Sequence, residues 1–102
     1  MTRRKLPTRR DSSHTRFEYN AKIYNVSASR FDDARLGEVW IDGAKAGTDV
    51  YFVMIELATV MSLALQHGAD PDQIRRALPQ TRSGKPLGPL GCALDALKEP
   101  HP

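Results

Sequence analysis

The stretch 50–66 carries a single charged residue, Glu56, in a run dominated by large apolar side chains. These apolar residues recur at spacings of three and four, which is the period of an α-helix. A residue that can cap a helix precedes the run and Gly68 follows it, so we predict a helix over 49–67. Because the apolar positions extend beyond one face, we expect this helix to be the central core element, contacted on more than one side.

The length and the cysteine content narrow the class of protein. A chain of 102 residues suits one small domain and leaves little room for a deep enclosed cavity. Its single cysteine excludes a disulfide framework and a cysteine-rich zinc site, and is compatible with a reducing cytosol. Every stretch of about 18 residues, the length that a membrane span needs, contains polar residues. The basic N-terminus is not followed by the apolar run that a secretory signal requires. We therefore expect a cytoplasmic protein without a membrane span or a secretory signal.

Two segments before the long helix have the pattern of β-strands. In 17–23 every second residue is apolar, which is the period of a half-buried strand. The apolar positions then move to the opposite face, and a bulge or a twisted edge within one strand over 17–28 would explain this shift. Residues 36–42 are rich in β-branched and aromatic side chains and form the second predicted strand. The polar link 29–35 fits a hairpin loop, so we expect an antiparallel pair.

Two short helices follow the long one. The motif at 70–73 combines a capping aspartate, a proline and a glutamine, and predicts a helix over 71–78 with Arg75 and Arg76 on its outward side. Proline and glycine mark the loop that comes next, and a last short helix is predicted over 92–98. The expected fold is α+β, with a small antiparallel sheet of two or three strands packed on one long and two short helices.

Charge is unevenly distributed along the chain. The net charge is +5 over 1–16, −5 over 17–74, +4 over 75–85 and −1 over 86–102, which gives the formal total of +3. We divide the chain into a basic arm (1–16), one domain (17–98) and a tail (99–102). The basic segments indicate contact with nucleic acid or with an acidic protein surface; the alternative is a solvated terminus, or an arm folded back on the acidic body. The candidate binding residues are Arg3, Arg4, Lys5, Arg9, Arg10, Arg16, Arg75, Arg76, Arg82 and Lys85.

Aromatic residues follow the first basic segment. Phe17, Tyr19 and Tyr24 could stack on bases, although alternating aromatic residues on a strand are more often part of the core. No helix-turn-helix or zinc-finger pattern accompanies them.

Three residues of the long helix and its cap are candidate ligand contacts. Thr48 and Asp49 stand at the helix start, where backbone N–H groups could meet a phosphate, although the Asp49 carboxylate would compete with an anion. Glu56 could be an acid, a base or a ligand contact. The alternative is that Glu56 forms a salt bridge to Lys22, Arg30 or Arg35, or lies at an exposed seam.

The sequence offers little catalytic or metal chemistry. The histidines and Cys92 are scattered and form no metal-ligand pair, so we expect no metal, no cofactor and no catalytic residue. Residues 11–14 include the types found in a hydrolytic triad, but neighbouring residues do not reach the geometry of a relay, and we interpret them as a polar turn. Cys92 has apolar neighbours and is interpreted as a small buried filler, with a reactive thiol as the alternative.

Two segments, RLGEVWIDGAKAGTDV (35–50) and ELATVMSLALQHGADPDQIRRAL (56–78), resemble the TSCPD domain. The late run GPLGCALDAL (88–97) looks like the ending of its free-standing members. The family's domain lies at the C-terminal end of cobalamin-dependent ribonucleotide reductases and also occurs alone in bacteria and phages. The Thr-Ser-Cys-Pro-Asp stretch that gives the family its name is absent from this chain.

The resemblance implies a place in deoxyribonucleotide metabolism. It would suggest a ribonucleoside-diphosphate reductase, yet that chemistry requires a radical-forming cysteine and a separate redox pair, and this chain has one cysteine. We therefore expect a non-catalytic accessory or regulatory module that binds a protein partner such as a ribonucleotide reductase. The alternative is a small nucleic-acid-binding protein that uses the basic residues of 1–16 and 75–85. A homodimer formed through the long helix fits either function.

Overall fold

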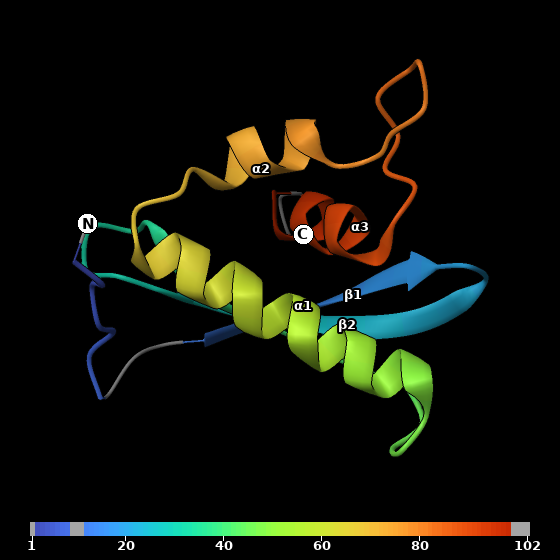
Figure 1. The fold of residues 1–102 in the computed structure, drawn as a ribbon, viewed down its shortest axis with the longest axis horizontal. Coiled ribbons are helices and arrows are strands. Elements are labelled where there is room, and N and C mark those ends of the chain that lie inside the picture. The colour runs from blue at the N-terminus through green and yellow to red at the C-terminus, as the bar shows by residue number, and fades with distance from the viewer. Residues whose placement is uncertain (1, 9–11, 99–102) are drawn as a thin grey trace.

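The computed structural model describes residues 2–8 and 12–98, so the predicted tail 99–102 lies outside the described residues. Three strands form one antiparallel sheet in the order β1-β2-β3, and three helices follow them along the chain. The predicted α+β fold is confirmed, with three strands (Figure 1). The elements are β1 (Ser12–Tyr19), β2 (Lys22–Arg30), β3 (Leu36–Asp42), α1 (Asp49–Gln66), α2 (Pro71–Ala77) and α3 (Pro89–Lys98).

The helix boundaries agree with the predicted ones to within a residue, except at the start of α3. Thr48 caps α1, because its hydroxyl accepts a hydrogen bond from the N–H of Tyr51. Asp70 caps α2 in the same way, and a proline stands at the first position of that helix. α3 begins at Pro89, three residues before the predicted start at residue 92.

A two-residue hairpin turn joins β1 to β2. Asn20 and Ala21 have φ angles of +53° and +62°, as a type I′ turn requires at both central positions. The apolar alternation restarts after this turn, and Phe17 faces Tyr24 across the two strands. The prediction of one strand over 17–28 with a bulge or a twisted edge is therefore wrong, because the shift of the apolar positions marks the turn.

β1 includes the last five residues of the predicted basic arm, 12–16. Residues 12–16 pair with β2 in a regular antiparallel register, so the arm is shorter than 1–16. The polar turn predicted over 11–14 is likewise wrong from Ser12 onward, because these residues belong to the strand; Asp11 lies outside the described residues.

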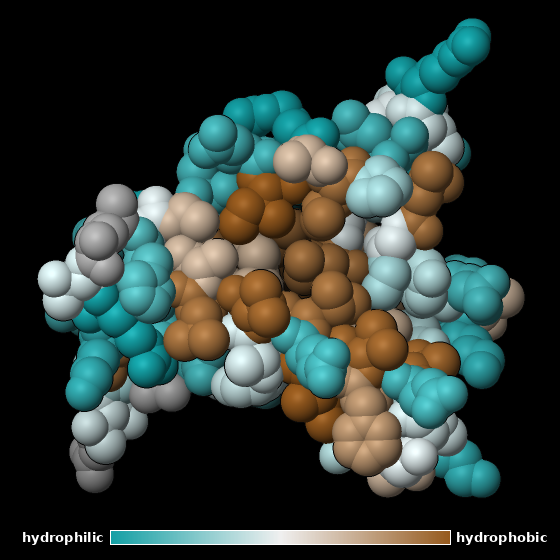
Figure 2. Space-filling view, viewed as in Figure 1, coloured by the Kyte–Doolittle hydropathy of each residue, from teal (hydrophilic) through white to brown (hydrophobic). Residues whose placement is uncertain are grey.

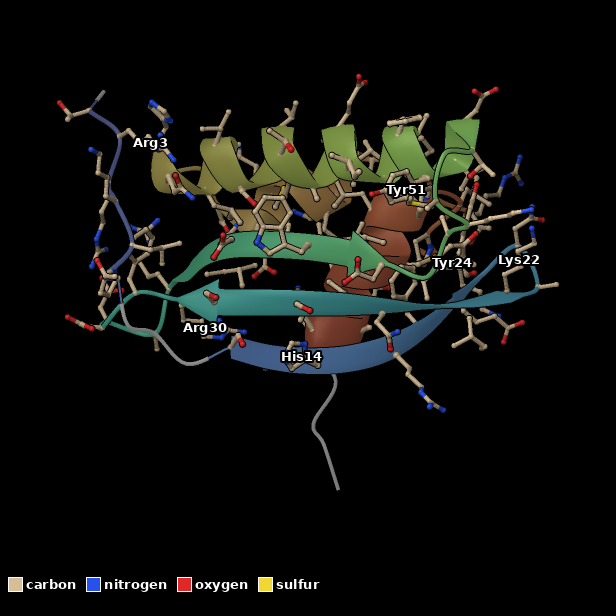
Figure 3. The ribbon with its side chains drawn as sticks, turned by 90° about the horizontal axis from the view of Figure 1, so that it is seen from below. Arg3, His14, Lys22, Tyr24, Arg30 and Tyr51 are labelled. Carbon is tan, nitrogen blue, oxygen red and sulfur yellow. The ribbon has the colours of Figure 1, made fainter. Side chains whose placement is uncertain are left out.

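α1 lies along the outer edge of β3, where a fourth strand would otherwise pair (Figure 3). The hydroxyl of Ser62 accepts a hydrogen bond from the N–H of Val39 and donates one to its C=O, each at 3.0 Å. The side-chain amide of Gln66 donates to the C=O of Gly37 at 3.0 Å. Two helix side chains thus satisfy backbone groups of an edge strand, which would be costly to leave unpaired when buried.

The core lies between the sheet and one side of each helix that covers it. α1 buries Met54, Ala58, Met61 and Leu65 against β3, while α3 packs beneath β1 and β2. The other side of α1 is exposed. The expectation that the long helix is contacted on several sides is therefore wrong, and this helix covers the edge of the sheet.

α1 also has the length and composition of a membrane-spanning helix. It has 18 residues with a mean hydropathy of 1.4, and a third of it is buried inside the fold. Within the part of the chain that the structure describes, it is the one helix that meets this criterion. Core helices of folded domains meet the same criterion; here the bonds from Ser62 and Gln66 attach α1 to the edge strand β3.

Candidate functional site

The structure distributes the predicted basic residues among several roles. Arg3 and Arg4 are attached to the C-terminal end of α1, since the N–H of Arg4 donates to the C=O of Gln66 and Nε of Arg3 donates to its side chain, both at 2.6 Å. The Arg4 guanidinium also lies 3.9 Å above the ring of Phe31 and 2.9 Å from Asp33. The hydrogen bond from Arg4 lowers the pKa of the Asp33 carboxyl. These two arginines hold the N-terminal segment on the body.

Arg75 is buried between α2 and α3, which corrects the prediction that it points outward. The residue is 7% exposed, and its guanidinium donates to both carboxylate oxygens of Asp95, at 2.6 and 3.0 Å. Further hydrogen bonds run to the side chain of Gln80 and to the C=O of Gly84. The hydrogen bond to Asp95 raises the pKa of Arg75. Arg75 therefore fixes a loop and does not contribute to a phosphate-binding surface.

The remaining basic residues are exposed but lie on different elements. Lys5 belongs to the N-terminal segment, Arg16 to β1 and Arg76 to α2. Arg9 and Arg10 lie outside the described residues. The eight predicted positions that the structure describes thus do not form one continuous basic surface.

Arg82 and Lys85 stand on a loop that projects from the body (Figure 1). Backbone hydrogen bonds close this loop, from the N–H of Thr81 to the C=O of Lys85 at 2.8 Å and from the N–H of Gly84 to the C=O of Thr81 at 2.9 Å. A bridge between Gln80 and Pro86 continues the pairing toward the body. The loop is thus an ordered element with two exposed cations near its tip.

The aromatic residues that were candidates for base stacking belong mainly to the core. Phe17 and Tyr24 are buried and stack on each other, with ring centroids 5.7 Å apart. Tyr19 is half-buried and packs at the edge of the same cluster. The core interpretation of these alternating residues is confirmed for Phe17 and Tyr24.

The outward side of α1 is apolar along much of its length. Phe52, Val53, Val60 and Leu63 are each between 40% and 67% exposed. Their spacings from Glu56 are three, four or seven residues, so they surround that carboxylate on one side of the helix. Figure 2 shows apolar residues gathered in a band over α1 and the adjoining helices. We call the side chains of these five residues the outer face of α1.

Glu56 lies exposed at the centre of the outer face. Among the residues that the structure describes, it forms no ion pair with Lys22, Arg30 or Arg35. Of the interpretations offered for it, the exposed seam is the one that its position matches. A partner that covers this face must supply a hydrogen-bond donor or a cation to Glu56, because burying a carboxylate unpaired is costly.

Thr48 and Asp49 act at the start of α1. The Thr48 hydroxyl donates a hydrogen bond to the C=O of Lys45 at 2.7 Å and accepts one from the N–H of Tyr51. The hydroxyl is therefore already used both as a donor and as an acceptor. Asp49 is exposed in the first turn, where its charge complements the helix dipole. Their observed roles are structural.

Cys92 is partly buried beside the core. Burial raises the pKa of the Cys92 thiol, and the negative charge of Asp95 raises it further. The thiol therefore remains protonated at neutral pH, which disfavours a nucleophilic role. Across residues 2–8 and 12–98, no three histidine, cysteine or acidic side chains come together as a metal site.

Comparison with known proteins gives the family. A family model for the TSCPD domain matches residues 2–98, nearly the whole chain. The chain belongs to the TSCPD domain family. The vitamin B12-dependent ribonucleotide reductase of Bradyrhizobium diazoefficiens is 32% identical to it over 88 residues. This match covers 86% of the present chain and 7% of the reductase. No solved structure matches the chain.

This TSCPD domain uses several residues that the sequence did not single out. Ser62 and Gln66 interrupt an apolar run, and that interruption was the available signal for a polar contact inside the fold. Trp40 is exposed on the sheet. The available signal was the strand alternation, which places Trp40 on the opposite side from the buried Val39 and Ile41.

Proposed function

We propose that this TSCPD domain is a non-catalytic accessory or regulatory module that binds a protein partner through the outer face of α1. The observation that carries the proposal is the set of four large apolar side chains exposed around Glu56 on one helix. Exposed apolar surface that is continuous and bordered by polar residues is typical of protein interaction sites. Covering one such side chain fully contributes about 1.5–3 kcal/mol, so a few of them can sustain a complex.

The partner that we propose is a ribonucleotide reductase or another enzyme of deoxyribonucleotide metabolism. Support comes from the relative, which is named a vitamin B12-dependent ribonucleotide reductase and contains a related segment in a much longer chain. A single cysteine with a raised pKa supports a role without catalysis. The partner's contact surface should be apolar and should carry a basic or donor group opposite Glu56.

Val60→Asp is expected to weaken binding to a purified cobalamin-dependent ribonucleotide reductase by about 100-fold or more. The substitution removes apolar contact and forces a second carboxylate into the interface beside Glu56. Val60 is 67% exposed, so the fold should tolerate the change. Surface plasmon resonance with the immobilised TSCPD domain measures the affinity, and circular dichroism confirms that the variant is folded.

The matched control is Ile23→Asp, which places the same charge at an apolar residue of similar exposure (59%) on β2. This variant should bind the reductase as the unchanged chain does. Failure of the unchanged chain to bind would contradict the proposed partner. A dimeric mass in solution that Val60→Asp converts to a monomer would assign the outer face to a second copy instead.

The projecting loop supports a second candidate function, binding to nucleic acid. Arg82 and Lys85 are exposed on an ordered loop, and among the described residues neither side chain has an ion-pair partner. Because backbone hydrogen bonds already order the loop, two cations on it can contact phosphates with only their side chains left to order. This function needs fewer residues than the sequence suggested, because Arg3, Arg4 and Arg75 have partners within the fold.

If the loop binds DNA, replacing both Arg82 and Lys85 with glutamine should weaken binding to a DNA duplex. The slope of log K against log salt should also fall in magnitude by about 2, one unit for each lost phosphate contact. Fluorescence anisotropy over a salt series measures both quantities. The paired control, Lys22→Gln with Lys45→Gln, removes the same charge from exposed positions elsewhere. Absence of binding at about 50 mM salt would exclude this function.

A further inference from the structure

Within residues 2–8 and 12–98, no helix covers the second face of the sheet, which Figure 3 shows toward the viewer. The strand register arranges its side chains in rows across β1, β2 and β3. His14, Ser27 and Trp40 form the central row, and Ser29 with Glu38 and Asn25 with Asp42 continue the rows on either side. This face is polar except for Trp40 near its middle and Ile23 toward one end of β2.

Trp40 is 42% exposed on this face. Glu38 and Asp42 stand two residues before and after it on β3, so their side chains point to the same face, about 7 Å away on either side. On the next strands, His14 Nδ1 and Ser27 Oγ share a hydrogen bond of 2.7 Å. These residues line a shallow hollow of about 410 Å³.

The chemistry of this hollow selects a cation. The face of an indole ring attracts positive charge, and the exposed Asp42 carboxylate on the same strand strengthens that attraction. A guanidinium group fits better than an ammonium group, because it is planar, stacks on aromatic rings and can pair with a carboxylate through two hydrogen bonds.

We propose that this hollow binds an arginine side chain of another protein, with its guanidinium stacked on Trp40 and paired with Asp42. The hollow lies on the sheet, whereas the outer face belongs to α1, so this inference does not rest on the proposed function. A phosphate-bearing ligand is disfavoured here, since the Asp42 carboxylate repels it.

Trp40 is the only tryptophan of the chain, so its fluorescence reports on the hollow directly. The full chain is titrated to roughly 10 mM with the peptide acetyl-Gly-Arg-Gly-amide at constant ionic strength. A saturable change in tryptophan emission is expected. The matched peptide with citrulline in place of arginine has nearly the same shape without the charge, and it should bind at least about fivefold more weakly.

Asp42→Asn should weaken binding of the arginine peptide by about tenfold, because a charge-assisted hydrogen bond is lost. Glu18→Gln is the control, since it removes the same charge from the same face but outside the hollow. The proposal is overturned if the emission does not saturate, if the citrulline peptide binds equally well, or if the two variants behave alike. Saturation by a nucleotide in place of the peptide would also overturn it.

Discussion

Asp95→Ala is expected to lower the melting temperature by roughly 10 °C or more. The substitution leaves the buried guanidinium of Arg75 without its carboxylate, and an uncompensated buried charge is among the most destabilising single changes. The same guanidinium holds Gln80 and Gly84, so the projecting loop should also lose its order. Thermal unfolding by circular dichroism measures the first effect, and amide exchange over 80–87 measures the second.

A second acid between the same two helices serves as the control. Asp72 of α2 pairs with Lys98 of α3, and both side chains are about half exposed. Asp72→Ala should therefore change the melting temperature by only a few degrees, because exposed ion pairs contribute little. Equal effects of the two substitutions would show that the Arg75–Asp95 pair contributes no more than a surface contact.

Ser62→Ala is expected to destabilise the domain by about 2–4 kcal/mol. Its hydroxyl satisfies both the N–H and the C=O of Val39 at a buried position, and each buried backbone group left unpaired costs about 1–3 kcal/mol. Urea unfolding followed by tryptophan fluorescence measures the free energy of unfolding. A lower midpoint with an unchanged slope would show a change in stability and not in the unfolded state.

Thr59→Ala offers a matched comparison within α1. It also removes a hydroxyl from the helix, but Thr59 is exposed and bonds only to the C=O of Ile55 in the preceding turn. Its loss should change the free energy of unfolding by less than about 0.5 kcal/mol. Similar losses for Ser62 and Thr59 would contradict the role assigned to α1 at the sheet edge.

The sequence predicted the helices well because their signals are local. Thr48 and Asp70 are capping residues at fixed positions, and the apolar period of α1 is long enough to be unambiguous. The hairpin was missed because Asn20 and Ala21 both adopt positive φ angles without a glycine, which is the usual signal for such a turn. The antiparallel arrangement followed correctly from the polar link between strands.

The candidate site was predicted less well because it depends on contacts distant in sequence. Arg75 meets Asp95 twenty positions away, and Arg3 meets Gln66 across 63 positions. No local pattern distinguishes these arginines from exposed ones. The sequence showed that α1 is apolar on more than one side, but not which side is buried. That depends on how the helix lies along the edge of β3, where Ser62 and Gln66 bond to the strand.

The bonds between α1 and β3 also limit how a partner can approach this domain. Many proteins recruit an extended peptide by adding it as a further strand, using the free backbone groups of a sheet edge. Along β3 the backbone groups of Val39 and the C=O of Gly37 are already bonded to the helix. A peptide strand could pair there only by displacing α1 and much of the core. Recognition at this side of the molecule must therefore depend on side chains, and single surface substitutions should be able to abolish it.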